Sequence, residues 1–170
     1  MILSENHLMI REMARQFAEK ELTREVLDEA EATNSFRKSV LDHMVQAGLT
    51  SIKIPEEYGG QGGDNLSFVI ALEEVCRKSA VAGIYMSNPN SLGSGPLLIN
   101  GTEEQKRKYL PMLTTGGVLG GMGITEPNAG SDASKSQTQA RLAGDHYVIN
   151  DSKIFSSRTA PKRACSSSSP

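Results

Sequence analysis

The sequence predicts an α+β fold, in which an N-terminal all-α helical bundle is followed by the first strands of an antiparallel β-barrel or sandwich domain that is incomplete. Apolar residues recur every three or four positions through most of the first 116 residues, which is typical of amphipathic helices. Five glycines then fall between positions 116 and 123, and beyond them apolar and polar residues alternate, as they do in strands. The chain has 170 residues, of which 38% are hydrophobic and 22% are charged, so it holds enough residues for one or two domains.

The composition argues against several classes of protein. The 18 basic and 20 acidic residues give a net charge of −2, which offers no positive field for a nucleic-acid backbone. No apolar run approaches the roughly 18 residues that a membrane-spanning helix needs. The first residues carry too many charges for a secretion signal, so we expect a cytoplasmic protein. The two cysteines, Cys76 and Cys165, cannot form a disulfide framework, and no His/Cys cluster has metal-ligand spacing.

Two helices are expected in the first 48 residues. Ser4 can cap the first helix, whose apolar residues lie three and four positions apart. They form one stripe: Ile10, Met13, Ala14, Phe17, Ala18 and Leu22. Ser35 is expected to cap the second helix and Gly48 to end it. The expected buried face of the second helix contains Val40, Leu41 and Met44.

A loop and a third helix are expected next. Residues 54–63 contain one proline and four glycines, which argues against regular structure there. The helix over 68–79 is expected to direct Cys76 into the core, where it would be a packing residue and not a nucleophile. Its expected buried face is Phe68, Ala71, Leu72, Val75, Cys76 and Ser79. Its expected solvent face is Glu73, Glu74, Arg77 and Lys78.

Two more helices complete an expected bundle of about five. Residues 90–99 are apolar but are interrupted by two glycines and a proline, which predicts a helix with an irregular start. Thr102 and Gln105 have the spacing of a capping box, which predicts a helix that runs to Leu113. We expect the helical domain to comprise residues 1–117.

The β domain is expected to begin at residue 118 and to extend over 118–157. Strands are predicted at 122–125, 136–142 and 146–149, and a further strand is expected to begin at 153–155. Gly144 and Asp145 are predicted to form the turn between the second and third of these strands.

The last thirteen residues, 158–170, have a different composition. They contain three basic residues, no acidic residue and no large apolar side chain. Burial in this segment could not offset the entropy of ordering it, so we expect a disordered, basic and serine-rich tail.

The segment from Ile124 to Asp132 is a predicted strand end that runs into a turn of small residues. The backbone N–H groups of this turn and the Ser131 hydroxyl could hold an anion such as a pyrophosphate. A tight surface turn without a ligand has the same composition, and neither the Walker nor the G-x-G-x-x-G pattern is present. The residues alone leave both interpretations open.

The same segment, Ile-Thr-Glu-Pro-Asn-Ala-Gly-Ser-Asp at 124–132, resembles the acyl-CoA dehydrogenase family, whose signature reads aliphatic-Thr-Glu-Pro-x-Ala-Gly-Ser-Asp. Asn-Asp-Ser-Lys-Ile-Phe at 150–155 resembles the family's Asn-Gly-x-Lys-x-Trp/Phe, with aspartate in place of the turn glycine. Earlier blocks that agree with the family are 17–22, 54–60 and 101–111. The resemblance covers about residues 1 to 155, which is less than half of a usual family member.

This resemblance implies a flavoprotein that removes hydrogens from the α and β carbons of an acyl-CoA thioester, with FAD as the acceptor. The residues that match the family's cofactor-binding positions are Met122, Ile124, Thr125, Gly130, Ser131, Phe155 and Ser157. The first three match the strand along the flavin ring, where backbone amides and the Thr125 hydroxyl would bond to its polar edge. Phe155 matches the aromatic residue packed on the flavin, and Ser157 matches a hydroxyl near N5.

Three residues are expected to contact the substrate. Gly130 and Ser131 match the turn beside the cofactor and the thioester, so Ser131 is expected to touch both. Asn-Ser-Leu-Gly at 90–93 matches a helical segment along the acyl chain, which makes Leu92 and Gly93 candidates for substrate contact. An ordinary buried helix would show the same pattern.

The family's carboxylate base lies in a C-terminal helical domain that this sequence does not reach, so no catalytic residue is expected here. We therefore expect an N-terminal fragment of an FAD-dependent acyl-CoA dehydrogenase that is inactive alone, and the composition break at 158 suggests truncation. The family's usual electron acceptor is an electron-transferring flavoprotein, and its full-length members are homo-oligomers. The alternative is a non-catalytic helical remnant or assembly module. Acyl chain length, and an oxidase or reductase activity in place of a dehydrogenase, stay open.

Overall fold

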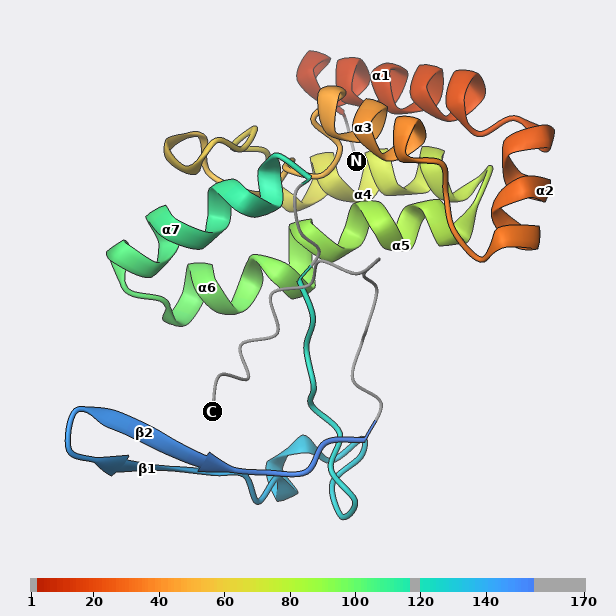
Figure 1. Ribbon diagram of the computed structural model, residues 1–170. Helices are drawn as coiled ribbons and strands as arrows, with labels where there is room; N and C mark the ends of the chain where they lie inside the picture. Colours follow the sequence, from red (N-terminus) through yellow and green to blue (C-terminus); the bar gives the residue numbers. More distant parts are fainter. Residues whose placement is uncertain (1–2, 117–119, 155–170) are drawn as a thin grey trace. The chain divides into compact units, whose positions relative to one another are not determined.

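The computed structural model describes residues 3–116 and 120–154 (Figure 1). Its contacts divide the chain into a helical unit that includes Gly120 and a second unit that begins at Gly121. Helices precede antiparallel strands, so the predicted fold class is confirmed. The predicted domain boundary after residue 117 and the predicted tail at 158–170 lie outside the described residues and stay predictions.

The helical unit contains seven α-helices in its described part. They are α1 (Glu5–Glu21), α2 (Arg24–Thr33), α3 (Lys38–Gln46), α4 (Asn65–Cys76), α5 (Ala80–Asn88), α6 (Gly95–Asn100) and α7 (Glu103–Thr114). The sequence prediction missed α2 and α5 as separate helices. α2 has no fully buried residue, and α5 is apolar around most of its circumference, so neither shows one clear stripe. No described helix has both the length and the apolar character to cross a membrane.

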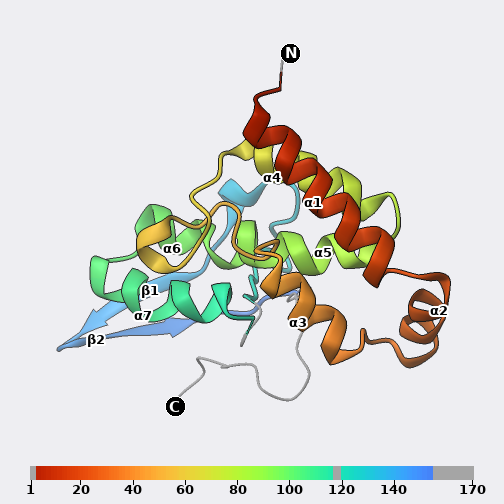
Figure 2. The same cartoon turned by 90° about the horizontal axis from the view of Figure 1, so that it is seen from above.

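α1 begins as the sequence predicts. The Ser4 hydroxyl accepts a hydrogen bond from the His7 amide, and the His7 ring accepts one from the Ser4 amide, which completes a reciprocal cap. The apolar stripe of α1 lies against α4 (Figure 2). The core that forms around this contact contains Ala14, Phe17, Ala18, Leu22, Phe36, Val40, Met44, Leu49, Ile52, Ala71, Val75, Ala82 and Met86.

The predicted cap at Ser35 is wrong, because α3 begins at Lys38 and has no side-chain cap. Ser35 belongs to the end of α2 instead. There Asn34 adopts a left-handed conformation with φ of 52°, and the Ser35 amide donates to the carbonyl of Ala30. The chain leaves α3 through Gly48, whose φ is +69°. This agrees with the prediction that Gly48 ends the helix.

The predicted face of α4 is also partly wrong. Glu74 is buried at 6% exposure, and Cys76 is exposed. The helix is turned so that Glu74 faces α1, where Arg15 donates two hydrogen bonds to its carboxylate at 3.0 and 3.3 Å. This ion pair, which periodicity does not encode, gives the buried carboxylate a hydrogen-bonding partner in place of water.

A second, smaller core contains Ile54, Tyr58, Leu110 and Leu113. It joins α7 to the predicted loop, which contains one 3₁₀ turn at Glu56–Tyr58. The predicted capping box of α7 is confirmed, since the side chains of Thr102 and Gln105 accept from each other's backbone amides. Gly60 packs so closely on the Ile54 carbonyl that a Cβ there would lie 1.9 Å from the oxygen.

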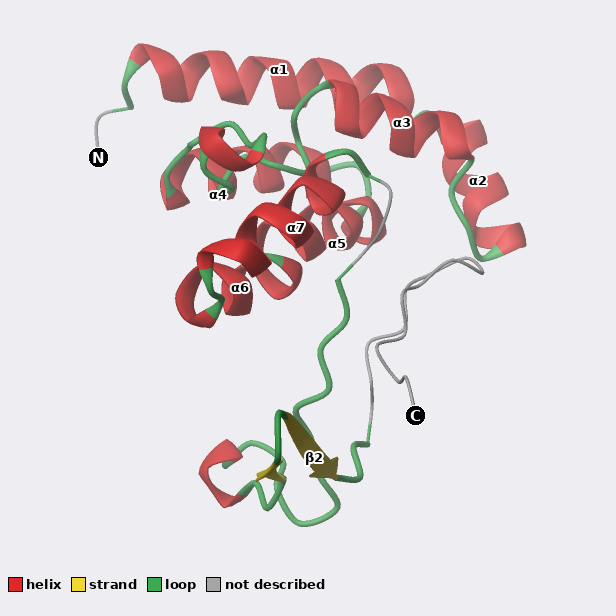
Figure 3. Ribbon diagram, turned by 60° about the vertical axis from the view of Figure 1, so that its left-hand side comes forward, coloured by secondary structure: helices red, strands yellow, loops and turns green. Residues whose placement is uncertain are grey.

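The second unit contains one antiparallel hairpin, β1 (Gln139–Ala143) and β2 (His146–Asn150), and is otherwise mostly loop (Figure 3). Its two-residue turn begins at Gly144, whose φ of +66° suits the tight turns of hairpins. Alternation along the strands places Ala140, Leu142, Tyr147 and Ile149 on one face, and all four are exposed.

Two predicted strands of this unit are wrong within the described residues. Residues 122–125 form no strand, and neither do Lys153 and Ile154; Phe155 lies outside the described part. The Ile154 amide donates to the Thr125 carbonyl at 2.8 Å, but this single bond does not make a ladder. A strand needs a partner along its length, and neither segment has one among the described residues.

Candidate functional site

The candidate site centres on the turn at 124–132, in the second unit. Glu126 and Ala129 exchange backbone hydrogen bonds of 2.9 and 3.1 Å, which closes a four-residue turn with Pro127 at its first corner. Proline at that position fixes φ near the value that such turns require. The turn therefore presents Gly130 and Ser131 immediately after a rigid corner, and both are exposed.

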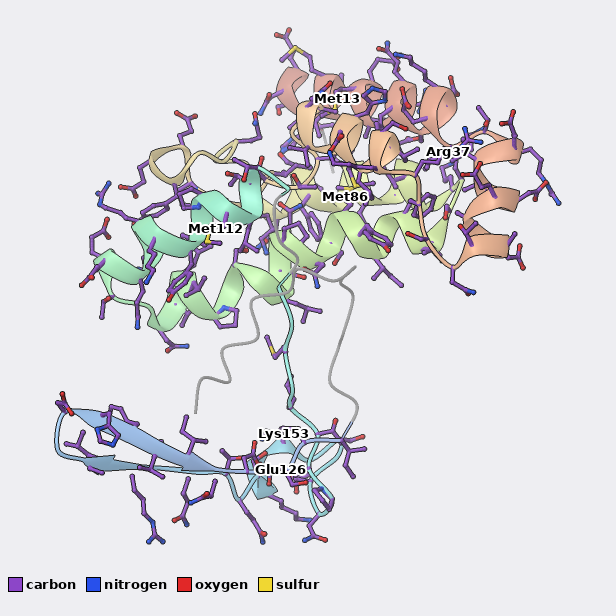
Figure 4. The ribbon with its side chains drawn as sticks, in the orientation of Figure 1. Met13, Arg37, Met86, Met112, Glu126 and Lys153 are labelled. Carbon is purple, nitrogen blue, oxygen red and sulfur yellow. The ribbon has the colours of Figure 1, made fainter. Side chains whose placement is uncertain are left out.

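The Glu126 carboxylate is buried at 6% exposure, and its side chain lies beside that of Lys153 (Figure 4). It accepts hydrogen bonds from the backbone amide of Gln137 at 2.6 Å and that of Thr138 at 3.2 Å, and from the Thr138 hydroxyl. The Lys153 ammonium donates to it at 2.7 Å. These donors, with the Gln137 amide foremost, hold the pKa of Glu126 at about 2.

Lys153, in the segment that follows β2, also bonds to this carboxylate. Its ammonium also donates to the Thr138 hydroxyl oxygen at 2.8 Å and lies 3.3 Å from the Asp151 carboxylate. The hydrogen bond to Glu126 is the main reason that the pKa of Lys153 is raised. Lys153 is therefore a cation fixed between two anions, with 24% of its side chain exposed.

The structure places five of the predicted cofactor residues in this unit. Met122 and Thr125 are half-buried, and Ile124, Gly130 and Ser131 are exposed. Within the described part of the chain, the amides of these residues and the hydroxyls of Thr125 and Ser131 donate to no protein acceptor. A Cβ at Gly130 would meet no atom within 4 Å. The turn thus offers several open donors on one short stretch of chain.

The other predicted site residues are elsewhere. Phe155 and Ser157 lie outside the described residues. Leu92 and Gly93 belong to the helical unit, in a π-helical turn at Pro89–Gly93 that gives the predicted irregular start before α6. Leu92 is 40% exposed, whereas Gly93 packs against Leu113. Single π-helical turns occur frequently at functional sites.

This π-helical turn is held by a buried amide side chain. Asn90 is 1% exposed; it donates to the carbonyls of Leu49 and Met86 and accepts from the Lys53 amide. The distance between these partners along the chain explains why sequence reasoning gave Asn90 no such role. A shallow hollow of about 440 Å³ lies between α2 and α5, and none of the predicted site residues lines it.

Sequence reasoning also missed the roles of Glu126 and Lys153. Both stand inside blocks that resemble the family, but their separation of 27 positions does not reveal that they pair. No group of three metal-ligating side chains occurs in the described ranges 3–116 and 120–154.

Comparison with known proteins identifies the family. The sequence model of one protein family, the acyl-CoA dehydrogenase N-terminal domain, matches residues 4–117. The chain is 51% identical over 155 residues to a protein of Acetobacterium woodii named caffeyl-CoA reductase-Etf complex subunit CarC, covering 91% of this chain and 41% of that protein. The chain thus spans about two fifths of the length of this relative.

Two solved structures share the fold. Butyryl-CoA dehydrogenase from Megasphaera elsdenii matches with a TM-score of 0.78 at 38% identity, over 92% of this chain and 42% of that one. An acyl-CoA dehydrogenase from Bacillus anthracis, complexed with FAD, matches with a TM-score of 0.75 at 37% identity, over 91% of this chain and 27% of that one. The domain match, which covers most of the described residues, confirms the predicted resemblance: the chain belongs to the acyl-CoA dehydrogenase family.

Proposed function

We propose that this chain supplies the N-terminal helical domain and the flavin-contacting turn of an FAD-dependent oxidoreductase that acts on the α and β carbons of acyl-CoA thioesters. The observation that carries the proposal is the set of open donors on either side of a rigid corner, at Met122, Ile124, Thr125, Gly130 and Ser131. Family membership gives this turn its chemical context, since one structural relative is complexed with FAD.

The residues fit FAD. Backbone amides at Met122 and Ile124, and the amide and hydroxyl of Thr125, would bond to the polar edge of the ring, where donors stabilise the charge of the reduced form. The open space at Gly130 allows a cofactor or thioester to approach the backbone closely. Ser131, which is exposed, would donate its hydroxyl to the same groups. Phe155 and Ser157 are proposed as further contacts of the flavin.

The proposed reaction interconverts a saturated acyl-CoA and its α,β-unsaturated counterpart, with FAD supplying or accepting the hydride at the β carbon while a proton is exchanged at the α carbon. Leu92 and Gly93 would line the acyl group, and Ser131 would orient the thioester. No residue of this chain is proposed as the base. A relative named as a reductase and another named as a dehydrogenase support both directions of the same chemistry.

The proposed electron partner is an electron-transferring flavoprotein, because the Acetobacterium relative is named as a subunit of an Etf complex. We also propose homo-oligomeric assembly and a cytoplasmic location, as expected from the resemblance and the composition.

A chimera tests the proposal. Residues 1–155 of this chain replace the matching segment of the Acetobacterium protein, and the product is purified and desalted. We expect a yellow protein that reduces caffeyl-CoA or oxidises butyryl-CoA. Thr125→Val and Ser131→Ala should each weaken flavin retention, whereas Arg141→Gln, on the hairpin outside the turn, should not. A folded but colourless chimera would contradict the proposal and favour a non-catalytic helical module.

A further inference from the structure

The segments of the second unit are linked through the buried Glu126 carboxylate and not through an apolar core. Among its described residues, only Glu126 and Ala129 are buried. Apolar side chains of the hairpin remain exposed, so they do not hold the loops of this unit together. The contacts that do converge are the hydrogen bonds and the ion pair at the Glu126 carboxylate.

These contacts link three separate segments. The turn contributes Glu126, the loop that leads into β1 contributes Gln137 and Thr138, and the chain after β2 contributes Lys153. The Ile154 amide adds a bond to the Thr125 carbonyl. The base of the hairpin is thereby tied to Thr125 and Glu126, where the turn begins.

Both oxygens of Glu126 are occupied. Oε2 accepts from the Gln137 amide, and Oε1 accepts from Thr138 and Lys153. With a pKa of about 2, this carboxylate stays ionised at neutral pH, and at 6% exposure it faces these protein donors and not solvent. It is therefore unsuited to act as a proton acceptor in the reaction, although it stands inside the site segment.

We propose that Glu126 and Lys153 are positioning residues: together they fix the conformation of residues 125–131, so that the donors of the turn are held ready for FAD. This inference rests on the proposed function for its ligand but not for its geometry. We name Glu126, Thr138 and Lys153 the Glu126 clasp. The clasp acts through the turn and does not itself touch the flavin.

A double-mutant cycle on the full chain tests the clasp. The variants are Glu126→Gln, Lys153→Met and the two combined, and the readouts are FAD affinity by flavin fluorescence anisotropy and amide hydrogen exchange of residues 121–154. Each single variant should raise the Kd for FAD about tenfold, as expected for the loss of a charge-assisted hydrogen bond, and the double variant should lose little more. Additive losses would overturn the pairing.

Two further variants separate positioning from general destabilisation. Lys153→Arg keeps the charge and should recover FAD affinity to within about threefold of the unchanged chain, since its guanidinium can still donate to the carboxylate. Exchanging the charges, Glu126→Lys with Lys153→Glu, should not rescue binding, because the amides of Gln137 and Thr138 require an acceptor at position 126. Rescue by the exchange would show a simple ion pair and overturn the clasp.

The control is Lys135→Met, which removes an exposed ion pair with Asp132 in the same unit. It should change neither readout. The exchange readout also separates the two proposals. If neither the unchanged chain nor the chimera binds FAD, the proposed function fails, yet faster exchange at the Gln137 and Ala129 amides in Glu126→Gln still supports the clasp. Unchanged exchange there would overturn it.

Discussion

Different forces stabilise the two units of this chain. The helical unit buries a continuous set of apolar side chains, among them Leu49, Ala71 and Met86 at 0% exposure. In the second unit, by contrast, the side chain of Leu142 is 66% exposed and that of Ile149 is 62% exposed. The hydrogen bonds that link its segments converge on the buried Glu126 carboxylate. The hydrophobic effect does not depend on direction, so it can stabilise several similar arrangements. A carboxylate that accepts several hydrogen bonds is stabilised only when its donors are correctly oriented.

The two units should therefore tolerate different substitutions. In the helical unit, free energy is spread over many contacts, so any deep cavity or overlap is costly. In the second unit, a two-stranded hairpin with an exposed apolar face is marginal by itself, and its order depends on a few polar groups. Stability measurements on matched variants should therefore separate the two units clearly.

The largest contrast is expected between two side-chain truncations. Met86→Ala empties a fully buried site in α5 and should lower the free energy of unfolding by about 2–5 kcal/mol. Ile149→Ala removes a side chain that is 62% exposed and should change it by less than about 0.5 kcal/mol. Urea unfolding followed by circular dichroism measures the helical variant, and hydrogen exchange of β2 measures the other. Equal costs would contradict the comparison.

A second contrast adds one methyl group to each unit. Gly60→Ala places a Cβ 1.9 Å from the Ile54 carbonyl oxygen, which is backbone and cannot move aside, so it should cost about 1–3 kcal/mol. Gly130→Ala meets no atom within 4 Å and should leave the free energy of unfolding within about 0.5 kcal/mol. Thermal melts of both variants check the pair, and a stable Gly60→Ala would refute the close packing of that loop.

The buried charge of the helical unit should give a smaller effect. Glu74→Gln leaves Arg15 without its carboxylate and should cost about 1–2 kcal/mol, a figure reduced because Arg15 is 43% exposed. Glu12→Gln, whose carboxylate is 56% exposed and 3.9 Å from Arg15, is the matched control and should cost less than about 0.5 kcal/mol.

Glu74 also predicts a pH dependence. Its hydrogen bonds from Arg15 lower its pKa below the ordinary glutamate value of 4.5. The unfolded chain thus takes up this proton at a higher pH than the folded chain does. The stabilisation is fully present above pH 4.5 and is lost as the pH falls toward the lowered pKa. In Glu74→Gln this part of the acid destabilisation should be absent; an unchanged pH profile would argue against the pair.

The smallest effect is expected at the hairpin turn. Gly144 has φ of +66°, which disfavours a residue with a Cβ. Gly144→Ala should cost the hairpin about 1 kcal/mol, and Gly144→Asn less, since asparagine tolerates this conformation better. Exchange rates of the β1 and β2 amides report both. If alanine and asparagine behave alike, the turn does not control the pairing.

The sequence predicted those elements whose signals are local. α1 and α7 follow from caps at Ser4 and Thr102, and the hairpin follows from alternation around Gly144. The rotated face of α4 was not predictable from period alone, because Arg15 and Glu74 meet from different helices. The same holds for the site: its turn is visible in the order of residues, but the clasp depends on Glu126 and Lys153, which only folding brings together.

Amide hydrogen exchange of the whole chain without added ligand distinguishes the forces that stabilise the two units. We expect slow exchange in α1, α4 and α5, whose amides open only with the apolar core, and exchange faster by orders of magnitude in β1 and β2. Within the second unit, the Gln137 amide, which donates to Glu126, should be the slowest. Hairpin amides as slow as those of α4 would contradict the claim that the two units are held by different forces.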